Sequence, residues 1–527
     1  MKRCFTFILA WWFFSYGGMQ DNYCQIPPND QMDEGCTIGV ASGKATTDGR
    51  PLVWKTRDNS SEPDNEIAFN SSCPIKFIAV INANETYAWM GVNEKGFAIV
   101  NSVTDDLNAG NSGPSNGQLM RDALGNCSTV ADFEALLIST NTTGRQTRAN
   151  FAVIDSTGAA AIFETAGYEF WKFDAHDSII APEGYILRTN FAFNGAAKNG
   201  LHDNIYSIER FRRQQTLIDQ FHRGDSLNHR SILRYQMRDF SDFDSQPLPV
   251  PYPQKWRYDR PFGYIYTGVS ICRSSSVSAS VIQGILPQES PRLSVLWTIL
   301  GQPAAGIAVP YFPVGQTPAA ANGTTTAPLC DISLQIRSLL FDYSANNHYI
   351  DSYKLRDDNA GGLWSKIFPA EDSIFTVSDS ITTQWRSQTT ISTDDILQTQ
   401  QAVAQYALRK LSHAFEGMVT SISDPQTIAI GPSRFQLWQN YPNPFNASTS
   451  IPMTLSADCF GQLQIFDLLG KIILSQNFHC SQTGYKEILF QPDNLASGVY
   501  LYRIRLFSDA DYRRVIFSKT KKLHYLK

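Results

Sequence analysis

A cysteine and an aspartate near the N-terminus are spaced so that one β-hairpin would bring their side chains together. Cys36 opens a β-rich run over residues 36–40, and a second run over residues 52–56 leads to Asp58. Asp48 and Gly49 lie between the two runs and form a typical hairpin turn signal. Because the midpoint between Cys36 and Asp58 falls beside this turn, we expect the two residues to face each other across the hairpin.

Two cations, Lys55 and Arg57, lie close to this aspartate in the sequence. A thiol opposite a carboxylate, with positive charge nearby, is the environment of an activated nucleophile. The alternative is a buried structural cysteine beside a surface ion pair, and residue types alone favour that alternative. A catalytic interpretation of Cys36 therefore needs support from other parts of the chain.

Other motifs that carry catalysis are absent or misplaced. Residues 113–117 fit the G-x-S-x-G pattern, but that motif needs a strand, a sharp turn and a helix, and residues 105–112 are predicted to be a loop. Gly224 and Ser226 follow a predicted helix and are interpreted as its C-terminal stop and a cap. The sequence contains no P-loop and no H-E-x-x-H, and its nine cysteines lack C-x-x-C spacing and nearby histidine pairs. We therefore expect no metal site and no cofactor.

Composition predicts several folded domains and excludes one class of partner. The chain has 527 residues, of which 43% are hydrophobic and 18% charged, so it can bury a large core. Lys and Arg number 44 against 49 Asp and Glu, which gives a net charge of -5. Without a basic excess, we expect no nucleic-acid partner.

The first residues have the pattern of a secretory signal peptide, which we place at residues 1–18. Lys2 and Arg3 precede an apolar run over residues 5–14 that is too short to span a bilayer, and small residues follow it. A short membrane anchor is the alternative. No later stretch is long and apolar enough to cross a membrane, so we expect an exported chain with no stable membrane span after cleavage.

The segment after the signal predicts a mixed α and β domain. β-rich runs alternate with turn signals between residues 36 and 173, and helices are expected over residues 119–124 and 131–138, the second capped by Ser128 or Thr129. Further helices are expected over residues 207–221 and from residue 393, where apolar residues recur at helical spacing. Residues 315–329 are predicted to be a surface loop. This order of elements suggests sheets covered by helices.

Residues 423–437 are predicted to be a linker that leads to a small C-terminal β unit. Beyond residue 437, β-rich runs are separated by turn residues at intervals of about ten residues, which is typical of a β-sandwich.

Four motifs, in order along the chain, resemble those of one enzyme family. Residues 36–58 are similar to the start of the mature chain in cysteine N-terminal-nucleophile (Ntn) hydrolases of the acyl-coenzyme A:6-aminopenicillanic acid acyltransferase (peptidase C45-like) group. Residues 91–97 resemble the G-x-N-E-K-G stretch of that group, residues 187–190 its Thr-Asn site and residues 209–211 its Arg-Phe helix. The choloylglycine hydrolases and penicillin V acylases are more distant. The resemblance implies an α+β fold whose catalytic domain, residues 36–422, is a four-layer αββα core.

The resemblance also implies a mechanism that begins at Cys36. In this family the nucleophile becomes the first residue after the bond to the preceding residue, here Gly35, is cut, so residues 19–35 would be a propeptide. The α-amino group of Cys36 would then be the general base, since a free α-amine has a pKa of about 7.7–8.0. Asp58 would hold that amine and the thiol in register.

Three further residues take roles by resemblance, and one departs from the family. Asn190 matches the residue that orients the site and donates to the oxyanion, Asn101 is a second oxyanion candidate, and Arg210 matches an arginine that supports the nucleophile. Lys55 stands where the bile-salt and penicillin members carry arginine. Arg57 would share its strand face, but lysine and arginine are not equivalent at a bidentate site.

The C-terminal unit, residues 438–527, resembles the sorting domains that direct cargo through the type IX secretion system. Residues 440–446 are similar to the Y-P-N-P-F-N opening of those domains. The resemblance implies secretion machinery as a partner and delivery through the periplasm to the outside or to the cell surface. The alternative is a generic immunoglobulin-like module.

Together these patterns predict an exported hydrolase that cleaves a linear amide, or transfers its acyl group, through a thioester at Cys36. Its other partner would be a small-molecule or peptide amide substrate. The alternative from another class is a non-catalytic binding protein displayed at the cell surface on a degenerate hydrolase scaffold, which only the departure at Lys55 favours.

Overall fold

The structure is a computed structural model. It describes residues 34–241, 248–252, 262–323, 326–342, 347–357, 361–388, 390–423, 435–437, 440, 442–455, 458–468, 470–480, 484–492 and 495–527. The predicted signal peptide, nearly all of the predicted propeptide and most of the predicted linker lie outside the described residues.

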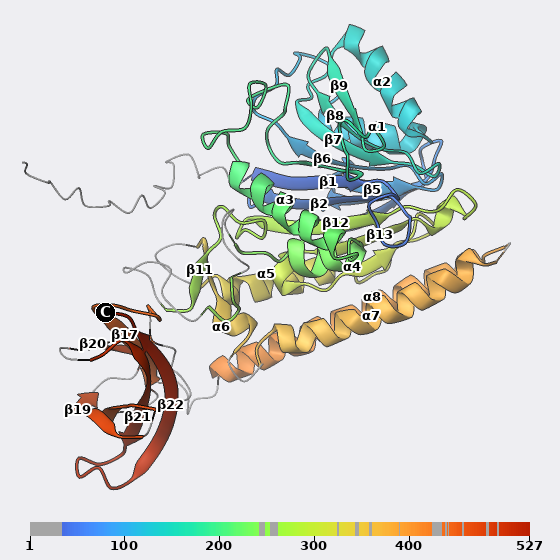
Figure 1. Ribbon diagram of the computed structural model, residues 1–527. Coiled ribbons are helices and arrows are strands. Elements are labelled where there is room, and N and C mark those ends of the chain that lie inside the picture. The colour runs from blue at the N-terminus through green and yellow to red at the C-terminus, as the bar shows by residue number, and fades with distance from the viewer. Residues whose placement is uncertain are drawn as a thin grey trace, which may run out of the picture. The chain divides into compact units, whose positions relative to one another are not determined.

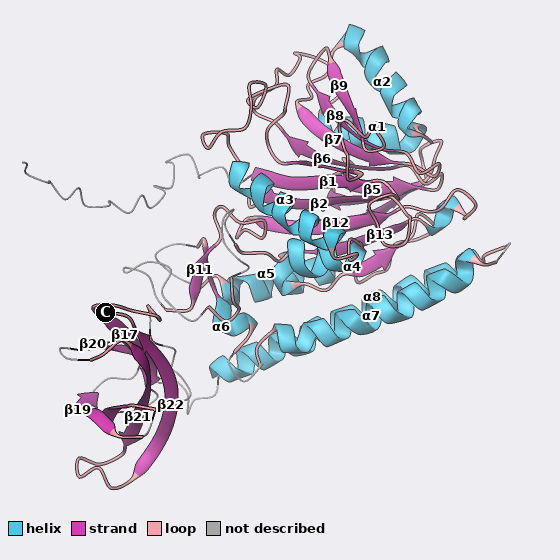
Figure 2. Ribbon diagram, viewed as in Figure 1, coloured by secondary structure: helices cyan, strands magenta, loops and turns pink. Residues whose placement is uncertain are grey.

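A six-stranded antiparallel sheet carries the candidate nucleophile (Figures 1 and 2). Its strands, in spatial order, are β10 (Tyr185–Arg188), β1 (Glu34–Ala41), β2 (Leu52–Asn59), β12 (Ser276–Gln283), β13 (Val295–Leu300) and β14 (Val309–Tyr311). Every residue of β2 is buried, polar residues included. Both faces of this sheet are therefore covered, and charged side chains on β2 must find partners inside the protein.

A second, seven-stranded sheet runs through consecutive strands. It consists of β3 (Asn65–Asn70), β4 (Phe77–Asn82), β5 (Met90–Asn93), β6 (Ala98–Val103), β7 (Ala149–Ile154), β8 (Ala160–Thr165) and β9 (Phe170–Asp174). Successive side chains of β4 point to opposite faces of the sheet, as in any strand, and therefore belong to two different hydrophobic cores. Ile78 and Val80 pack with residues of the six-stranded sheet, whereas Phe77, Ala79 and Ile81 pack with residues of two helices.

Those two helices are α1 (Asn116–Asn126) and α2 (Val130–Thr143). Thr129 caps α2, with a capping box completed by Asp132, so the second of the two predicted caps is the one used. Phe133 of α2 lies against Phe163 of the sheet with ring centroids 5.3 Å apart. Helices α1 and α2 thus cover the outer face of the seven-stranded sheet.

The family-like stretch at residues 91–97 has a structural role here. A Cβ at Gly91 would lie 2.8 Å from the Ile78 carbonyl oxygen and 2.7 Å from the Leu124 side chain of α1, and the backbone contact leaves room only for glycine. Asn93 donates to the Leu124 and Cys127 carbonyls and accepts from the backbone of Lys95 and Phe97. The stretch therefore ties the β5–β6 turn to the end of α1.

Helices also pack on the other side of the six-stranded sheet. They are α3 (Ile208–Arg223), α4 (His229–Ser231) with a π-helical turn after it (Ile232–Gln236), α5 (Pro328–Leu340), α6 (Ser352–Leu355), α7 (Trp364–Arg386) and α8 (Thr393–Ser423). Two 3-10 turns (Pro291–Leu293 and Pro303–Ala305) and a small sheet of β11 (Tyr264–Tyr266) and β15 (Tyr349–Asp351) complete this part. Helix α8 packs on α5, α7 and β14.

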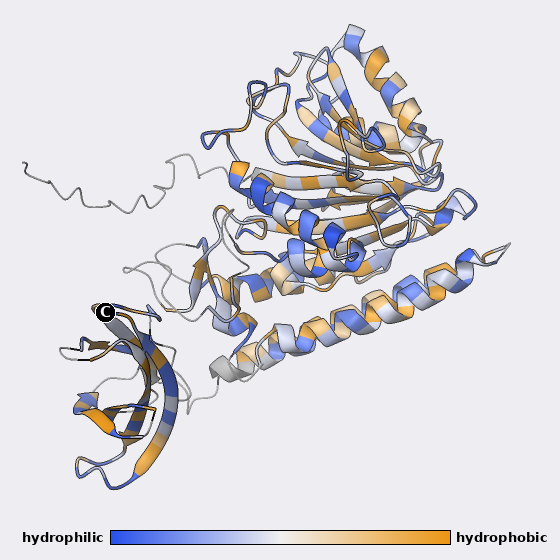
Figure 3. Ribbon diagram, in the orientation of Figure 1, coloured by the Kyte–Doolittle hydropathy of each residue, from blue (hydrophilic) through white to orange (hydrophobic). Residues whose placement is uncertain are grey.

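The apolar stripe predicted on the last helix is confirmed. Ile396, Ala407 and Leu411 are fully buried in α8, and Val403 nearly so. Orange and blue segments alternate along the strands and helices of Figure 3, as expected for elements with one buried face.

The prediction of a surface loop over residues 315–329 is wrong in part. The segment up to residue 327 is irregular, but Ala320 and Ala321 are buried, and α5 already begins at Pro328. The carbonyl of Ala321 accepts the backbone N–H of Ile67 on β3, the edge strand of the seven-stranded sheet. This hydrogen bond holds residues 320 and 321 against the edge of the sheet, where they are buried.

The C-terminal strands form two sheets around a core of their own. One sheet contains β16 (Gln436–Leu437), β17 (Thr449–Leu455) and β20 (Gly484–Phe490), and the other β19 (Ile472–Cys480), β18 (Cys459–Phe466), β21 (Gly498–Phe507) and β22 (Val515–Tyr525). Side chains of both sheets share one cluster that includes Ile451, Leu463 and Tyr502. Among the described residues, no helix has the length and apolarity needed to cross a membrane.

Candidate active site

Cys36 lies on β1 and is 7% exposed. Across the hairpin it pairs with Arg57, and Asp58 pairs with Gly35. The prediction that Cys36 and Asp58 face each other is therefore wrong by one residue. The last pair before the loop is Ala41 with Leu52, so the Asp48–Gly49 turn lies off the centre of a longer connection. A shift of one residue places a side chain on the opposite face of a sheet.

Cys36, Lys55 and Arg57 share the face that looks toward the seven-stranded sheet. Lys55 Nζ donates to Asn101 Oδ1 of β6 at 2.7 Å and to the Trp89 carbonyl at 3.4 Å. Arg57 Nη1 donates to Asn65 Oδ1 at 3.1 Å, and its guanidinium lies 4.7 Å from the centroid of the Trp89 ring.

Lys55 is also an electrostatic neighbour of the Cys36 side chain, because it pairs with Ile38, two residues along β1 from Cys36. The pKa of Lys55 is lowered to about 8, chiefly by burial; Arg57 acts in the same direction, and Cys36 and Asp58 oppose it. A lysine amine is thus held beside the thiol with a pKa close to neutrality.

Asp58 lies on the other face of the hairpin. Its Oδ1 accepts from Ser276 Oγ at 2.6 Å, and Arg273 Nη1 is 3.7 Å from Oδ2. Burial raises the pKa of Asp58, although Arg273 and Arg210 oppose this. Oδ2 accepts no hydrogen bond from the described residues. It lies 3.1 Å from the position that a side chain at Gly35 would occupy.

Asn190 and Arg210 contact the backbone of Cys36 directly. Asn190 Oδ1 accepts the Cys36 N–H at 2.9 Å and Arg210 Nη2 at 2.7 Å, while Arg210 Nη1 donates to the Cys36 carbonyl at 2.7 Å. Asn190 Nδ2 donates to the Val103 carbonyl at 2.9 Å. The three contacts that Asn190 makes agree on one orientation of its amide, so the nitrogen of Cys36 has a fixed acceptor.

Two carboxylates, the buried Glu164 and the half-buried Asp106, fix the loop that follows Asn190. Glu164 pairs with Arg188 at 2.8 Å and accepts the backbone N–H groups of Phe193 and Asn194. Asp106 Oδ2 accepts the N–H groups of Ala192 and Ala196. Because the loop leaves β10 at Arg188, these contacts determine where Asn190 lies beside β1.

The six predicted site residues thus lie around strand β1, in three groups. Cys36, Asn190 and Arg210 form one hydrogen-bonded group, Lys55 and Asn101 form a second on the thiol face, and Asp58 lies behind Gly35.

Sequence analysis missed Arg273, which lies just before β12 and is 3% exposed. It is the one charged residue between positions 261 and 288. A lone arginine in an apolar, β-rich run is a signal that could have found it, because buried arginine needs a partner.

The rejected motifs have structural roles. Ser115 caps α1 and accepts from Gln118 N, and Ser226 Oγ donates to the Phe221 carbonyl at the end of α3. No group of His, Cys, Asp and Glu side chains suited to a metal ion occurs among the described residues.

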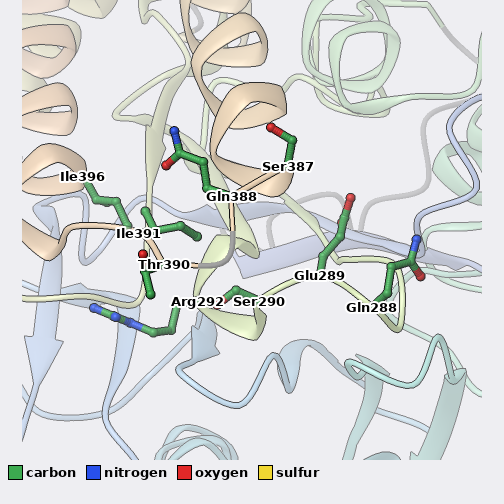
Figure 4. Close-up of a pocket in the computed structure, with 9 residues that line it drawn as sticks. All are labelled: Gln288, Glu289, Ser290, Arg292, Ser387, Gln388, Thr390, Ile391 and Ile396. Atoms are coloured by element: carbon green, nitrogen blue, oxygen red, sulfur yellow. The ribbon is translucent and has the colours of Figure 1, made fainter.

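A cavity of about 590 Å³ lies elsewhere, between the turn after β12 and the α7–α8 connection (Figure 4). Its lining is mostly polar: Gln288, Glu289, Ser290, Arg292, Ser387, Gln388, Thr390, Ile391 and Ile396. None of the six predicted site residues lines it.

Two regions of the sequence match family models. Residues 45–279 match "Acyl-coenzyme A:6-aminopenicillanic acid acyl-transferase", and residues 439–518 match "Secretion system C-terminal sorting domain". Both resemblances predicted from the sequence are thereby confirmed. The first match begins after Cys36, so the hypothesis that Cys36 is the nucleophile depends on the contacts described above. No curated protein matches the chain.

Several solved structures are similar to part of the chain at low identity. Penicillin V acylase from Agrobacterium tumefaciens is 13% identical over 53% of this chain and 86% of its own, with a TM-score of 0.33. A variant of conjugated bile acid hydrolase from Clostridium perfringens is 13% identical over 50% and 89%, with a TM-score of 0.31. An N-acylethanolamine-hydrolyzing acid amidase ortholog from Caenorhabditis elegans is 12% identical over 49% and 93%, with a TM-score of 0.28.

Proposed function

We propose that this protein is an exported Ntn-type amidase, because residues 45–279 match the acyl-coenzyme A:6-aminopenicillanic acid acyl-transferase family and residues 439–518 match a secretion sorting domain. It would cleave a linear amide through a thioester at Cys36 after self-cleavage between Gly35 and Cys36. The catalytic domain would occupy residues 36–422, as a four-layer αββα core, and the sorting domain residues 438–527, as an immunoglobulin-like sandwich.

The contact between the Cys36 nitrogen and Asn190 is the observation that carries this proposal. Cys36 lies near the start of β1, outside the part that pairs with β10 (Ile38–Ala41), and a buried backbone N–H needs a hydrogen-bond partner. This one donates to a side chain that is itself held by an arginine and a carbonyl. After cleavage, the same nitrogen is an α-amine in an oriented position, next to the thiol from which it must take a proton.

Asp58 supports the second half of the mechanism. Its Oδ2 is buried without a hydrogen bond from the described residues, which is costly for a carboxylate oxygen. The oxygen lies behind Gly35, where departure of the propeptide would free space for the new amine. Asp58 would then accept a hydrogen bond from that amine and balance its charge.

The oxyanion of the tetrahedral intermediate needs donors on the thiol face. Asn101 Oδ1 accepts from Lys55, and the Asn101 amide nitrogen, which donates to no other described residue, would donate to the oxyanion. Asn190 Nδ2 is bound to the Val103 carbonyl in the uncut chain, so its part in oxyanion binding would require that contact to break. We therefore assign Asn101 as the first donor and Asn190 as the residue that orients Cys36.

Hydrolysis rather than acyl transfer fits the destination of the protein. The sorting domain directs export, and an enzyme outside the cell meets water as the abundant acceptor and little acyl-coenzyme A. The substrate class we propose is an N-acyl amine, such as an N-acyl amino acid or an acylated β-lactam.

The competing function is a surface-displayed binding protein on a hydrolase scaffold. The observation that favours it is Lys55, which replaces the arginine of the distant relatives. Labelling with a thiol-reactive electrophile at neutral pH separates the two functions. The amidase should show one fast-reacting thiol, in a peptide that begins with Cys36, and loss of activity in proportion to labelling.

The control for this experiment is Cys127→Ala. Burial raises the pKa of the Cys127 thiol to about 12, so it should be inert. Labelling and hydrolysis of an N-acyl amine panel should survive Cys127→Ala and disappear in Cys36→Ala. Equal slow labelling of all cysteines, with no hydrolysis, would support the binding protein.

A further inference from the structure

The amine of Cys36 cannot be the base for the step that creates it. In the uncut chain this nitrogen is an amide that donates to Asn190, and an amide does not accept protons at neutral pH. The thiol must nevertheless lose a proton before it can attack the Gly35 carbonyl, because the thiolate is the reactive form. Self-cleavage therefore needs another proton acceptor beside Cys36.

Asp58 does not fill this role in the uncut chain. It pairs with Gly35 rather than Cys36, so its carboxylate lies on the face opposite to the thiol. Its Oδ1 is engaged by Ser276, and Arg273 and Arg210 lie next to it.

Lys55 is on the correct face. It pairs with Ile38, two residues along β1 from Cys36, so its side chain is the diagonal neighbour of the thiol. Lys55 is 1% exposed, and its Nζ donates to Asn101 Oδ1 at 2.7 Å, which fixes the amine on the thiol face. An arginine at this position would be protonated at all relevant pH values, whereas a buried lysine is not.

We propose that Lys55 is the base that activates Cys36 for self-cleavage, a role that rests on the proposed function and deepens it. The Sγ–H bond breaks and its proton moves to Nζ, then Sγ bonds to the Gly35 carbonyl carbon. The Gly35–Cys36 C–N bond breaks, and the proton is returned to the departing nitrogen. Water hydrolyses the resulting thioester, which leaves a Gly35 carboxylate and restores the thiol.

The surroundings of Lys55 explain why it is partly neutral near physiological pH. Its pKa is lowered to about 8, chiefly by burial and also by Arg57 on the same strand, against the opposing effects of Cys36 and Asp58. The lowered pKa makes the neutral form of Lys55, which can accept a proton, more accessible than that of an exposed lysine.

Chemical rescue tests the proposal. Full-length Lys55→Ala should be recovered uncut, and propylamine should restore cleavage because it supplies a base to the space left by truncation. Propylguanidinium, which carries the same charge without a basic nitrogen, should not. Lys55→Arg should be cut at least a hundredfold more slowly than the wild type, since general bases contribute about that much. Lys44→Arg, at an exposed position in the loop between β1 and β2, is the matched control and should be cut normally.

The appearance of a chain that starts at Cys36, followed by mass spectrometry, is the readout. Cleavage of Lys55→Ala and Lys55→Arg at the wild-type rate would overturn the role of Lys55 while leaving the amidase intact. A Cys36→Ala protein with full amidase activity would instead overturn the proposed function itself. Equal rescue by the amine and the guanidinium would show that charge, not basicity, is supplied by Lys55, and would also overturn the proposal.

A second inference rests on the sorting domain alone. Cys459 of β18 and Cys480 of β19 are directly opposite each other, and each is 1% exposed. Their side chains interact with each other within the core of this domain. Opposite residues of an antiparallel pair have Cβ atoms about 4.5–5.5 Å apart, within a small movement of disulfide geometry.

We infer that Cys459 and Cys480 form a disulfide during export. Each thiol loses a proton, an S–S bond forms, and two electrons pass to the disulfide of a periplasmic thiol–disulfide oxidoreductase, which is reduced to a dithiol. Exported protein should show a cross-linked peptide pair lighter by two hydrogens, and reduction should lower the melting temperature of the wild type but not of a Cys459→Ser, Cys480→Ser double variant. Two freely alkylated thiols in unreduced exported protein would contradict the inference.

Discussion

The backbone nitrogen of Cys36 and Asn190 Oδ1 are joined by a 2.9 Å hydrogen bond while Cys36 is still within the chain. Arg210 holds the same oxygen at 2.7 Å and also the Cys36 carbonyl. The peptide nitrogen is thus already placed where a catalytic α-amine would have to be. Cleavage would change the chemistry of this nitrogen from amide to amine while its partner is retained.

Asn190→Ala should remove this orientation. The Cys36 nitrogen and Arg210 Nη2 would both lose their acceptor, so we expect kcat to fall about a hundredfold with little change in KM. Asn194→Ala is the control, because this neighbour donates to Glu164 and does not contact Cys36. Steady-state kinetics of the cleaved enzymes measures the effect. Comparable kcat values for the two variants would show that the contact has no part in catalysis.

The rate of self-cleavage should depend on the size of any side chain introduced at position 35. An added Cβ would lie 3.0 Å from Arg273 Nη1, 3.1 Å from Asp58 Oδ2 and 3.2 Å from Arg210 Nη2. These are the ends of side chains, so Gly35→Ala should slow self-cleavage and Gly35→Val should block it. The fraction of cut chain over time is the measurement. Gly498→Val, at an uncrowded position in β21, should be cut normally, and normal cutting of Gly35→Val would refute the crowding argument.

Local patterns predicted much of the fold and the neighbourhood of the site, but not the pairing within it. The β1–β2 hairpin and the apolar stripe of α8 follow from residue periodicity, which a single sequence shows directly. The register of β1 and β2 does not, because residues 42–51 form a long connection whose centre no turn signal fixes. Because the predicted register was wrong by one residue, Asp58 was predicted on the opposite face of the sheet from the one it occupies.

Arg273 shows a second limit of the sequence. It lies more than sixty positions after Arg210, and only the pairing of β12 with β2 brings it beside Asp58. No local spacing encodes that contact. Lys55 was recognised as a departure from the family, but its contact with Asn101 depends on how the two sheets pack, which is a property of the tertiary structure.

Glu371 of α7 should be a main contributor to the stability of the catalytic domain. It is fully buried, pairs with Arg238 at 2.7 Å and Arg234 at 2.9 Å, and accepts the Ala308 N–H. Glu371→Gln would remove the counter-charge of Arg238 and leave Arg234 with Asp372 alone, and breaking a buried ion pair typically costs about 3–5 kcal/mol. Asp372→Asn is the control: its side chain is 64% exposed, and a loss below about 1 kcal/mol is expected. Urea denaturation measures both.

The same pair predicts a pH dependence. Burial alone would raise the pKa of Glu371, but Arg238 and Arg234 outweigh it, so the pKa lies below the ordinary 4.5. The ionised form is therefore favoured by folding. The contribution of Glu371 to the free energy of unfolding is complete above pH 4.5, its ordinary pKa. This contribution is lost as the pH falls through the lower pKa that Glu371 has in the folded protein. Wild-type stability should decline more steeply below pH 4.5 than that of Glu371→Gln, and parallel declines would contradict this assignment.

Deletion of residues 438–527 should separate activity from delivery. The sorting domain has its own core, so the catalytic domain should keep its activity without it. The truncated protein should accumulate in the periplasm, whereas the full chain reaches the outside or the cell surface. Amidase activity and immunoblots of cell fractions measure the two properties. Normal surface delivery of the truncated protein would contradict the role of this domain as an address.

The N-terminus of the purified, active protein tests the central claim most directly. Intact-mass and N-terminal peptide analysis should show a chain that begins at Cys36 with a free α-amine. Cys36→Ala should remain uncut and inactive, and Cys36→Ser should cleave slowly because serine keeps a weaker nucleophile. A fully active protein whose chain still begins upstream of Gly35 would contradict the N-terminal-nucleophile mechanism.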